Sequence, residues 1–422
     1  MRNLSGSTVL GALGVGANSA VRAATIGLRM GLVLAMAAWL GPAELGVYGL
    51  IAATVTLTSY LYGHDFYTFT VRQVSIHELG RLRYQTRDQF VLFGAIYVVG
   101  GIVLTAVLPI FGLDPILAAL TAVIAALQHA GLEIYRILVR IERPLAASLC
   151  FFIRDAAWIP AILLLWLLRG DGTLFDVLGV WFIGLLIGTG FGVGMLLRAL
   201  PAAPPRPIDP AWLARGVRTG LRMLPGTLST WGLLTVDKMI LALLVPPEVL
   251  GAYVFFATIC GAFWGLFETG VLTFYWPRLL EAARHGDVAE QDRAQRALGR
   301  VCLIGAPALA TMSLVVGAGF SWVLPHEAYA QHIGLLPYLA AAFMFLTLAN
   351  VPHYRLYAGN RDLAIVLSNA ASFAAFLALA GLLSLVSTTQ AVPIALMAAC
   401  MLMLALKWVA VWWGRRTAPL KG

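Results

Sequence analysis

Charged side chains are scarce in this sequence. Asp, Glu, Lys and Arg make up 12% of the 422 residues, whereas hydrophobic residues make up 60% and the mean hydropathy is +0.85. A soluble domain of this size has too little interior to hide so much apolar surface. The shortage of charge therefore excludes an ordinary soluble protein and indicates that lipid is the solvent.

Cysteine is also rare, and its four copies all lie inside apolar runs: Cys150, Cys260, Cys302 and Cys400. They lack the spacing of zinc ligands or of paired half-cystines. This excludes a disulfide framework and gives no support for a zinc site. We expect all four to be small buried hydrophobes.

Long apolar runs fill most of the chain. A bilayer-length ruler of about 20 residues gives twelve candidate spans. Those of the first half are 17–40, 46–70, 89–111, 115–139, 147–168 and 174–198. Those of the second half are 216–244, 249–276, 297–323, 329–354, 361–386 and 391–413. Proline and glycine at 40–44, 112–115 and 245–248 predict tight turns. The sequence thus predicts an all-α integral membrane protein.

One phrase occurs twice, at residues 42–53 and 247–258. At one fixed offset Pro42, Leu45, Gly46, Tyr48 and Ala52 match Pro247, Leu250, Gly251, Tyr253 and Ala257. Such a repeat predicts a duplicated bundle, which is a common plan for a transporter. We expect an N-terminal six-helix lobe over 1–200, a Pro-rich linker over 201–215 and a C-terminal six-helix lobe over 216–422.

The charges outside the spans alternate in sign from loop to loop. Basic residues gather at 72–87, 140–143, 198–215, 278–300, 361 and 415–421. The opposite loops hold Glu44, Asp114, Asp171, Asp176, Glu248 and Glu327, with a lone Arg169. The positive-inside rule then puts both termini and the linker in the cytoplasm, with the two lobes parallel. Topology also accounts for most of the net charge of +9, so no nucleic acid is needed to explain it.

Arginines inside the spans point to an anion site. Arg22 and Arg29 are seven residues apart and Arg218 and Arg222 four apart, so each pair shares a helix face. A lone charge in lipid costs at least a few kcal/mol, and Arg29 sits mid-span, which favours a water-filled cavity. For Arg218 and Arg222 the alternative is snorkelling to the cytoplasmic face. Guanidinium groups suit phosphate because they offer paired, permanently charged donors.

Other charges also lie inside spans, among them Asp65, Glu133, Arg154, Asp155, Asp237, Lys238 and Glu268. Asp237 and Lys238 form either a gate or a structural ion pair. Arg154 and Asp155 are candidates for pairing with other helices. The two glutamates either pair with a neighbouring arginine or carry a proton.

With these residues the sequence resembles the Wzx-type polysaccharide flippases of the multidrug/oligosaccharidyl-lipid/polysaccharide (MOP) exporter superfamily. The matching parts are Arg29, the runs 40–49 and 65–72, and the Val-Asp-Lys-Met-Ile run at 236–240 ahead of the second Leu-Gly-Ala-Tyr phrase. The 6+6 arrangement agrees over nearly the whole chain.

The resemblance implies a flippase, not an enzyme, in the bacterial inner membrane. It would move an undecaprenyl-diphosphate-linked oligosaccharide from the cytoplasmic to the periplasmic leaflet by alternating access, for cell-surface polysaccharide biosynthesis. A cationic cavity for this glycan would use Arg29, Arg22, Arg218, Arg222 and Arg154.

The same resemblance implies no cofactor and an ion gradient, of H⁺ or Na⁺, as the energy source. The coupling or gating candidates are Asp65, Glu133, Asp155, Asp237, Lys238 and Glu268. The expected partners are the lipid-linked glycan and membrane lipid, with a polysaccharide polymerase and glycosyltransferases as candidate partner proteins.

Two alternatives remain open. A MATE-like multidrug antiporter shares the fold but prefers cationic cargo, and the arginine excess argues against it. A membrane-embedded polysaccharide polymerase, ligase or acyltransferase needs a large outer loop or a cluster of acid, His and Arg residues. The outer loops are short, and His326, Glu327 and His332 form the only such outer cluster in the sequence.

Overall fold

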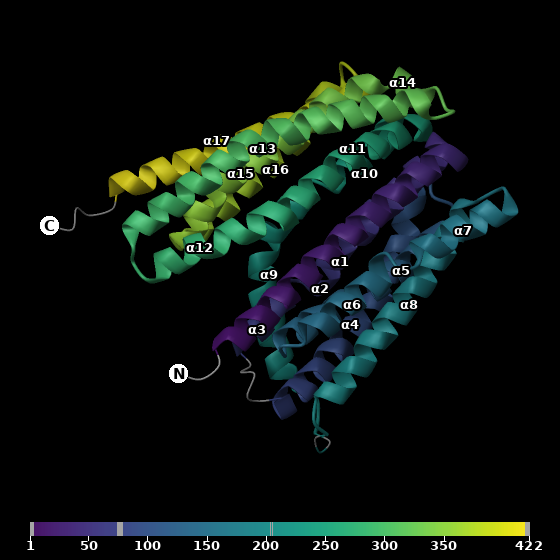
Figure 1. Ribbon diagram of the computed structural model, residues 1–422. Helices are drawn as coiled ribbons and strands as arrows, with labels where there is room; N and C mark the ends of the chain where they lie inside the picture. Colours follow the sequence, from purple (N-terminus) through teal and green to yellow (C-terminus); the bar gives the residue numbers. More distant parts are fainter. Residues whose placement is uncertain (1–3, 74–78, 203, 205, 418–422) are drawn as a thin grey trace. The chain divides into compact units, whose positions relative to one another are not determined.

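The computed structural model describes residues 4–73, 79–202, 204 and 206–417, and every regular element within them is a helix (Figure 1). Eleven of these helices are long and apolar enough to cross a membrane. The number is twelve if α9 (Pro210–Gly232) and α10 (Val236–Leu244) form one span, bent by 58°. The prediction of an all-α membrane protein with about twelve spans is confirmed.

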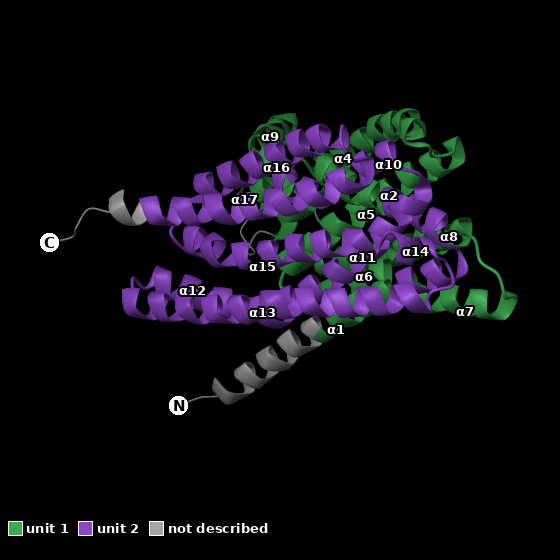
Figure 2. Ribbon diagram, turned by 90° about the horizontal axis from the view of Figure 1, so that it is seen from above, with its two compact units in different colours: residues 1–32, 51–227 green, residues 33–50, 228–422 purple. Residues whose placement is uncertain are grey.

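The chain divides into two compact units, coloured separately in Figure 2. Unit 1 contains residues 1–32 and 51–227, and unit 2 contains residues 33–50 and 228–422. The divisions fall inside α1 (Leu4–Trp39), α2 (Pro42–Gly63) and α9. The lobes expected over 1–200 and 216–422 stay a prediction, as do the linker and the side of the membrane that holds the termini. Residues 203 and 205 of that linker lie outside the described residues.

Unit 1 is built from the N-terminal part of α1, the C-terminal part of α2, the N-terminal part of α9 and six further helical segments. These are α3 (Phe66–Gln73), α4 (Leu79–Val107) with a 3₁₀ turn (Leu108–Phe111), α5 (Pro115–Arg140), α6 (Pro144–Asp155), α7 (Ile159–Arg169) and α8 (Leu174–Ala199). One apolar core joins α4, α5, α6 and α8 through residues such as Leu82, Leu138, Cys150 and Leu196. A second, aromatic core joins α3, α4 and α9 through Phe66, Phe69, Phe93 and Trp212.

Unit 2 packs its helices around α15 and α17. Its elements are α10, α11 (Pro247–Phe267), a π-helical turn (Glu268–Leu272), α12 (Thr273–Arg284), α13 (Val288–Val323), α14 (Ala328–Gln331), a 3₁₀ turn (Ile333–Leu335), α15 (Leu336–Ala358), α16 (Asp362–Ser384) and α17 (Thr388–Thr417). A buried apolar cluster ties α11 and its π turn to α13 and α15 through Phe267, Leu272, Leu298, Cys302 and Val351.

The helix ends follow from local sequence. Proline occupies the first position of α2, α5, α6 and α11, where its missing N–H costs nothing and its fixed φ suits the helix. Thr173 and Asp176 form a capping box at the start of α8. The turns predicted at 40–44, 112–115 and 245–248 are confirmed.

Several expected spans are interrupted, including 216–244, which contains the bend between α9 and α10. The helix expected over 46–70 stops at Gly63, because His64 and Asp65 have left-handed backbone angles (φ 46° and 50°), and α3 begins at Phe66. The helix expected over 147–168 breaks between Asp155 and Ile159. The span itself is confirmed, because Pro144–Arg169 is long and apolar enough to cross a membrane as one stretch.

The duplicated phrase has a structural cause within unit 2. A Cβ atom on Gly46 would collide with the carbonyl oxygen of Pro247 and lie 2.9 Å from the nitrogen of Gly251. Reciprocally, a Cβ on Gly251 would collide with the carbonyl oxygen of Pro42. The two copies of the phrase therefore meet each other, each glycine against the other copy's proline, where α2 and α11 begin.

Candidate functional site

Two arginines and one amide converge on the Asp155 carboxylate in unit 1. Asp155, the last residue of α6, is 2% exposed. Its Oδ1 accepts from Arg29 Nη2 of α1 at 3.0 Å and from Gln128 Nε2 of α5 at 3.1 Å. Its Oδ2 accepts from Arg154 Nε at 2.6 Å. We call these four residues the Asp155 centre. With two cations and one anion, it carries a net positive charge.

Arg154 is held in a narrow slot. The side chain is 2% exposed, and its guanidinium lies 5.6 Å from the ring centroid of Phe151. A Cβ on Gly131 of α5 would lie 2.7 Å from Arg154 Cδ, and one on Gly188 of α8 would lie 2.7 Å from its backbone nitrogen. Small residues at these positions on α5 and α8 therefore make room for a buried arginine.

Arg29 and Arg22 differ from Arg154 in exposure. The Arg29 side chain is 48% exposed, although its Nε also donates to the carbonyl oxygen of Asp155 at 3.3 Å. Arg22 is exposed and donates from Nη2 to the Tyr135 hydroxyl of α5 at 3.2 Å. Both arginines thus contact other helices of unit 1, in keeping with the single helix face that their seven-residue spacing gives them. The positive charge of the Asp155 centre is therefore exposed at the surface through the Arg29 side chain.

Arg218 and Arg222 lie exposed on α9. Within the described part of the chain, neither is brought to the Asp155 centre. Their assignment to a cationic cavity stays a prediction.

A second buried network surrounds Glu133 of α5. Its Oε2 accepts from Gln89 Nε2 of α4 at 2.9 Å, and its Oε1 accepts from Arg136 Nη1 at 2.6 Å. His129 Nε2 lies 3.7 Å from Oε1, and His129 Nδ1 is 2.7 Å from the Tyr97 hydroxyl. Of the two alternatives for Glu133, pairing with a neighbouring arginine is the arrangement that the structure contains.

In unit 2 the buried Asp237 pairs with its neighbour. Lys238 Nζ lies 3.0 Å from Asp237 Oδ2, and the Tyr253 hydroxyl donates to the same oxygen at 2.7 Å. Lys238 also donates to the carbonyl oxygen of Leu234 at 3.1 Å. Because Tyr253 belongs to the second copy of the duplicated phrase, this ion pair is tied to α11. The geometry shows the ion pair, and both the structural and the gating role stay predictions.

The other two carboxylates lie at helix irregularities. Asp65 occupies the left-handed turn between α2 and α3, where its carbonyl oxygen accepts from the Thr68 nitrogen at 2.9 Å. Glu268 begins the π turn after α11, and its carbonyl oxygen accepts from Thr273 Oγ1 at 3.1 Å. The five candidate coupling carboxylates are thus spread over both units, and their roles stay predictions.

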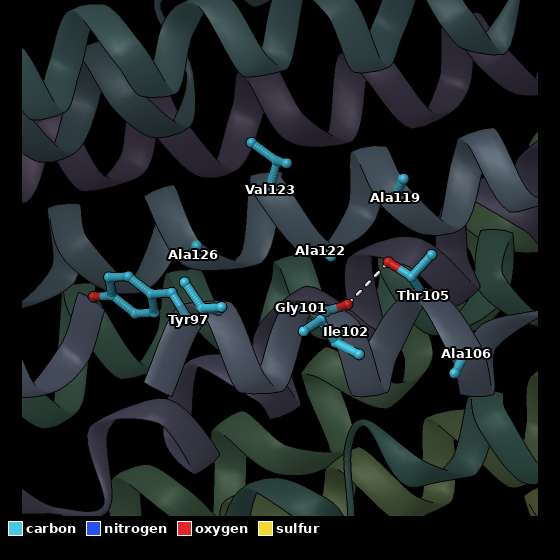
Figure 3. Close-up of a pocket in the computed structure, with 10 residues that line it drawn as sticks. Tyr97, Gly101, Ile102, Thr105, Ala106, Ala119, Ala122, Val123 and Ala126 are labelled. Carbon is cyan, nitrogen blue, oxygen red and sulfur yellow. Dashed lines mark hydrogen bonds between the residues drawn. The ribbon is translucent and has the colours of Figure 1, made fainter. Parts of the chain in front are cut away.

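A groove of about 670 Å³ is lined by residues of α4 and α5 in unit 1 (Figure 3). It is lined by Tyr97, Val98, Gly101, Ile102, Thr105, Ala106, Ala119, Ala122, Val123 and Ala126. The Thr105 hydroxyl donates to the Gly101 carbonyl oxygen at 2.9 Å, which leaves a mainly apolar lining without a charged side chain. The groove suits hydrocarbon and offers nothing to a phosphate.

Sequence reasoning missed the uncharged partners of these networks, namely Gln89, Gln128, His129 and Tyr135. A polar side chain in an otherwise apolar span was the available signal. Among the residues that the structure describes, no group of three His, Cys, Asp or Glu side chains is arranged to hold a metal ion.

The fold and these networks define a multi-pass, all-helical membrane protein with charged networks buried inside its units. No family model matches the sequence, and no curated protein matches it. Solved structures do match. The lipid II flippase MurJ, in an inward closed conformation, aligns with a TM-score of 0.72 at 12% identity, over 96% of this chain and 87% of that chain.

Two MATE transporters share the fold. An inward-facing MATE family transporter of the MOP superfamily aligns with a TM-score of 0.64 at 12% identity, covering 95% of this chain and 99% of that chain. The eukaryotic MATE transporter AtDTX14 aligns with a TM-score of 0.62 at 15% identity, covering 94% of each chain. At such low identity the likeness establishes the fold, which is that of MOP-type transporters and flippases.

Proposed function

We propose that this protein is a flippase for a polyprenyl-diphosphate-linked oligosaccharide, with cell-surface polysaccharide biosynthesis as its role. The observation that carries the proposal is the net positive charge of the Asp155 centre, accessible at the half-exposed Arg29. A sugar–diphosphate head group cannot cross hydrocarbon unaided, because its charges and hydroxyls would lose water. An arginine fork replaces that water with paired, charged donors.

In this proposal the diphosphate binds Arg29, with Arg22 two helical turns away as a second contact, while the prenyl tail stays in lipid. The protein then alternates between states open to either leaflet of a bacterial inner membrane, and the glycan moves from the cytoplasmic to the periplasmic side. The ligand shifts this equilibrium only by binding the two states unequally. The likeness to a lipid II flippase supports a lipid-linked cargo, and the arginine excess supports an anionic one.

The energy source we propose is a gradient of H⁺ or Na⁺. Asp155, Asp237 and Glu133 each have a side-chain cation within 3.0 Å. Asp65 differs, because its Oδ2 is buried and makes no hydrogen bond to the described residues. Asp65 is therefore the carboxylate that we favour for ion coupling.

Arg29→Ala tests the proposal in cells. Export of the glycan should stop while protein level stays normal, and complete lipid-linked units should accumulate. Arg29→Lys should retain partial export if charge suffices without the fork. Arg169→Ala is the matched control, since Arg169 is also about half exposed and also pairs with a carboxylate, Asp176, in unit 1. Unchanged export in Arg29→Ala would remove this residue from the mechanism.

A further inference from the structure

The two arginines on Asp155 are bound to it unequally. Arg154 directs Nε and Nη2 to the same oxygen, Oδ2, at 2.6 and 2.5 Å. Arg29 reaches the carboxylate with one nitrogen, at 3.0 Å, and shares Oδ1 with Gln128. Arg154 is 2% exposed and Arg29 is 48% exposed. One arginine is fixed in the interior and the other lies at the surface.

The charges of this centre do not balance. Arg154 alone neutralises Asp155, so Arg29 is a surplus cation that shares an already neutralised carboxylate. A half-exposed ion pair of this kind is weak, whereas a buried charge without a partner is strongly destabilising. Arg29 is thus the partner that can leave Asp155 without stranding a buried charge.

We propose that Arg154 is a positioning residue for anion binding: by neutralising Asp155 it keeps Arg29 exchangeable, so that a diphosphate can take Arg29 from the carboxylate. The inference rests on the proposed function and adds to it a buried residue that controls affinity without touching the ligand. Gln128 remains on Oδ1 when Arg29 leaves, which limits the cost of the exchange.

Removing Arg154 alone should lower the affinity of Arg29 for an anion. Asp155 would then be a buried carboxylate whose remaining charged partner is Arg29, and attraction between charges strengthens as the surroundings become less polar. Arg29 would be held more tightly, and an anion would have to compete for it. Removing Arg154 and Asp155 together abolishes the competitor, so Arg29 would be free to bind.

The test uses the full chain in detergent micelles and farnesyl diphosphate as the probe, with affinity measured by calorimetry. Arg154→Met should weaken binding about tenfold, or about 1.4 kcal/mol. The double variant Arg154→Met/Asp155→Asn should bind as tightly as the unmodified protein or more tightly. Arg29→Ala should lose binding in every background. Asp292→Asn, which breaks an ion pair with Arg355 in unit 2, is the control and should leave the affinity unchanged.

A merely structural role for Arg154 would weaken binding in the single and the double variant alike, and that result would overturn the proposal. If Arg154→Met fails to fold, two variants decide instead. Arg154→Lys keeps the charge and should bind normally, while the double variant has no buried charge to strand. Weakened binding in both would contradict the inference.

The outcomes also separate this inference from the proposed function. Opposite effects of the single and double variants, in a protein that moves no lipid-linked glycan, would keep the exchange and reject the flippase. Glycan transport in which the single and double variants do not have opposite effects on binding would keep the flippase and reject the exchange. If farnesyl diphosphate binds the unmodified protein no better than Arg29→Ala, Arg29 is not an anion site and the inference fails.

Discussion

Asp237 shows at the scale of one residue how this protein keeps a charge inside an apolar unit. The carboxylate accepts hydrogen bonds from Lys238 and Tyr253, and its side chain is almost fully buried. A buried ion pair adds little stability over an apolar pair, but breaking it strands a charge. The polar partners are therefore as important to the fold as the charges.

Asp237→Asn should destabilise the protein by about 3 kcal/mol, because Lys238 and Tyr253 lose their charged acceptor. Asp292→Asn should cost less than about 1 kcal/mol, because its ion pair with Arg355 is partly exposed. Unfolding of the two variants in mixed micelles measures the difference. Equal losses would show that the Asp237 network carries no special stability.

The sequence predicted part of the Asp155 centre. Spacing put Arg22 and Arg29 on one face, and Arg154 and Asp155 are adjacent in the chain. It did not predict that Asp155 would bind both Arg29 and Gln128, because those contacts depend on how α1, α5 and α6 pack. Helix spacing fixes which side chains share a face, but not which helix that face meets.

At the scale of elements, the clearest link between sequence and structure is the duplicated phrase. Its glycines predicted a repeat, and the structure shows why glycine is needed: Gly46 and Gly251 each face a proline carbonyl of the other copy. The break at His64 and Asp65 shows the opposite case. Its left-handed backbone was not predicted, because the apolar residues on the two sides of Asp65 together reach the length of one span.

Gly251→Ala should destabilise unit 2 by about 2 kcal/mol, since the added methyl group meets backbone atoms, which cannot turn aside. Gly261→Ala on the same helix is the matched control. Its Cβ would lie 3.7 Å from the ring of Phe343, an ordinary contact, and alanine favours the helix by up to about 1 kcal/mol. Unfolding of both variants under identical conditions gives the comparison, and a stable Gly251→Ala protein would contradict the packing argument.

At the scale of the whole molecule, composition predicted a membrane protein and the apolar runs predicted about twelve spans, and the structure confirms both. The fold is shared with a lipid II flippase and with a multidrug resistance MATE family transporter. Because one fold serves such different cargo, the cargo has to be argued from the charged side chains.

The predicted topology can be tested by cysteine labelling. All four native cysteines are buried, so the folded protein should react little with a membrane-impermeant maleimide. Asp171→Cys should label from the periplasmic side and His285→Cys only after the inner membrane is permeabilised, because the positive-inside rule puts residue 285 in the cytoplasm. The reverse pattern would invert the predicted orientation.

Transport in reconstituted vesicles decides whether this protein is a flippase. A polyprenyl-diphosphate-linked oligosaccharide is placed in both leaflets, and a membrane-impermeant glycosidase reports how much reaches the outer one. The full chain should expose the inner pool to the enzyme, Arg29→Ala should not, and Arg169→Ala should behave like the unmodified protein. An inner pool that stays protected with the unmodified protein, as it does in protein-free vesicles, would contradict the flippase assignment.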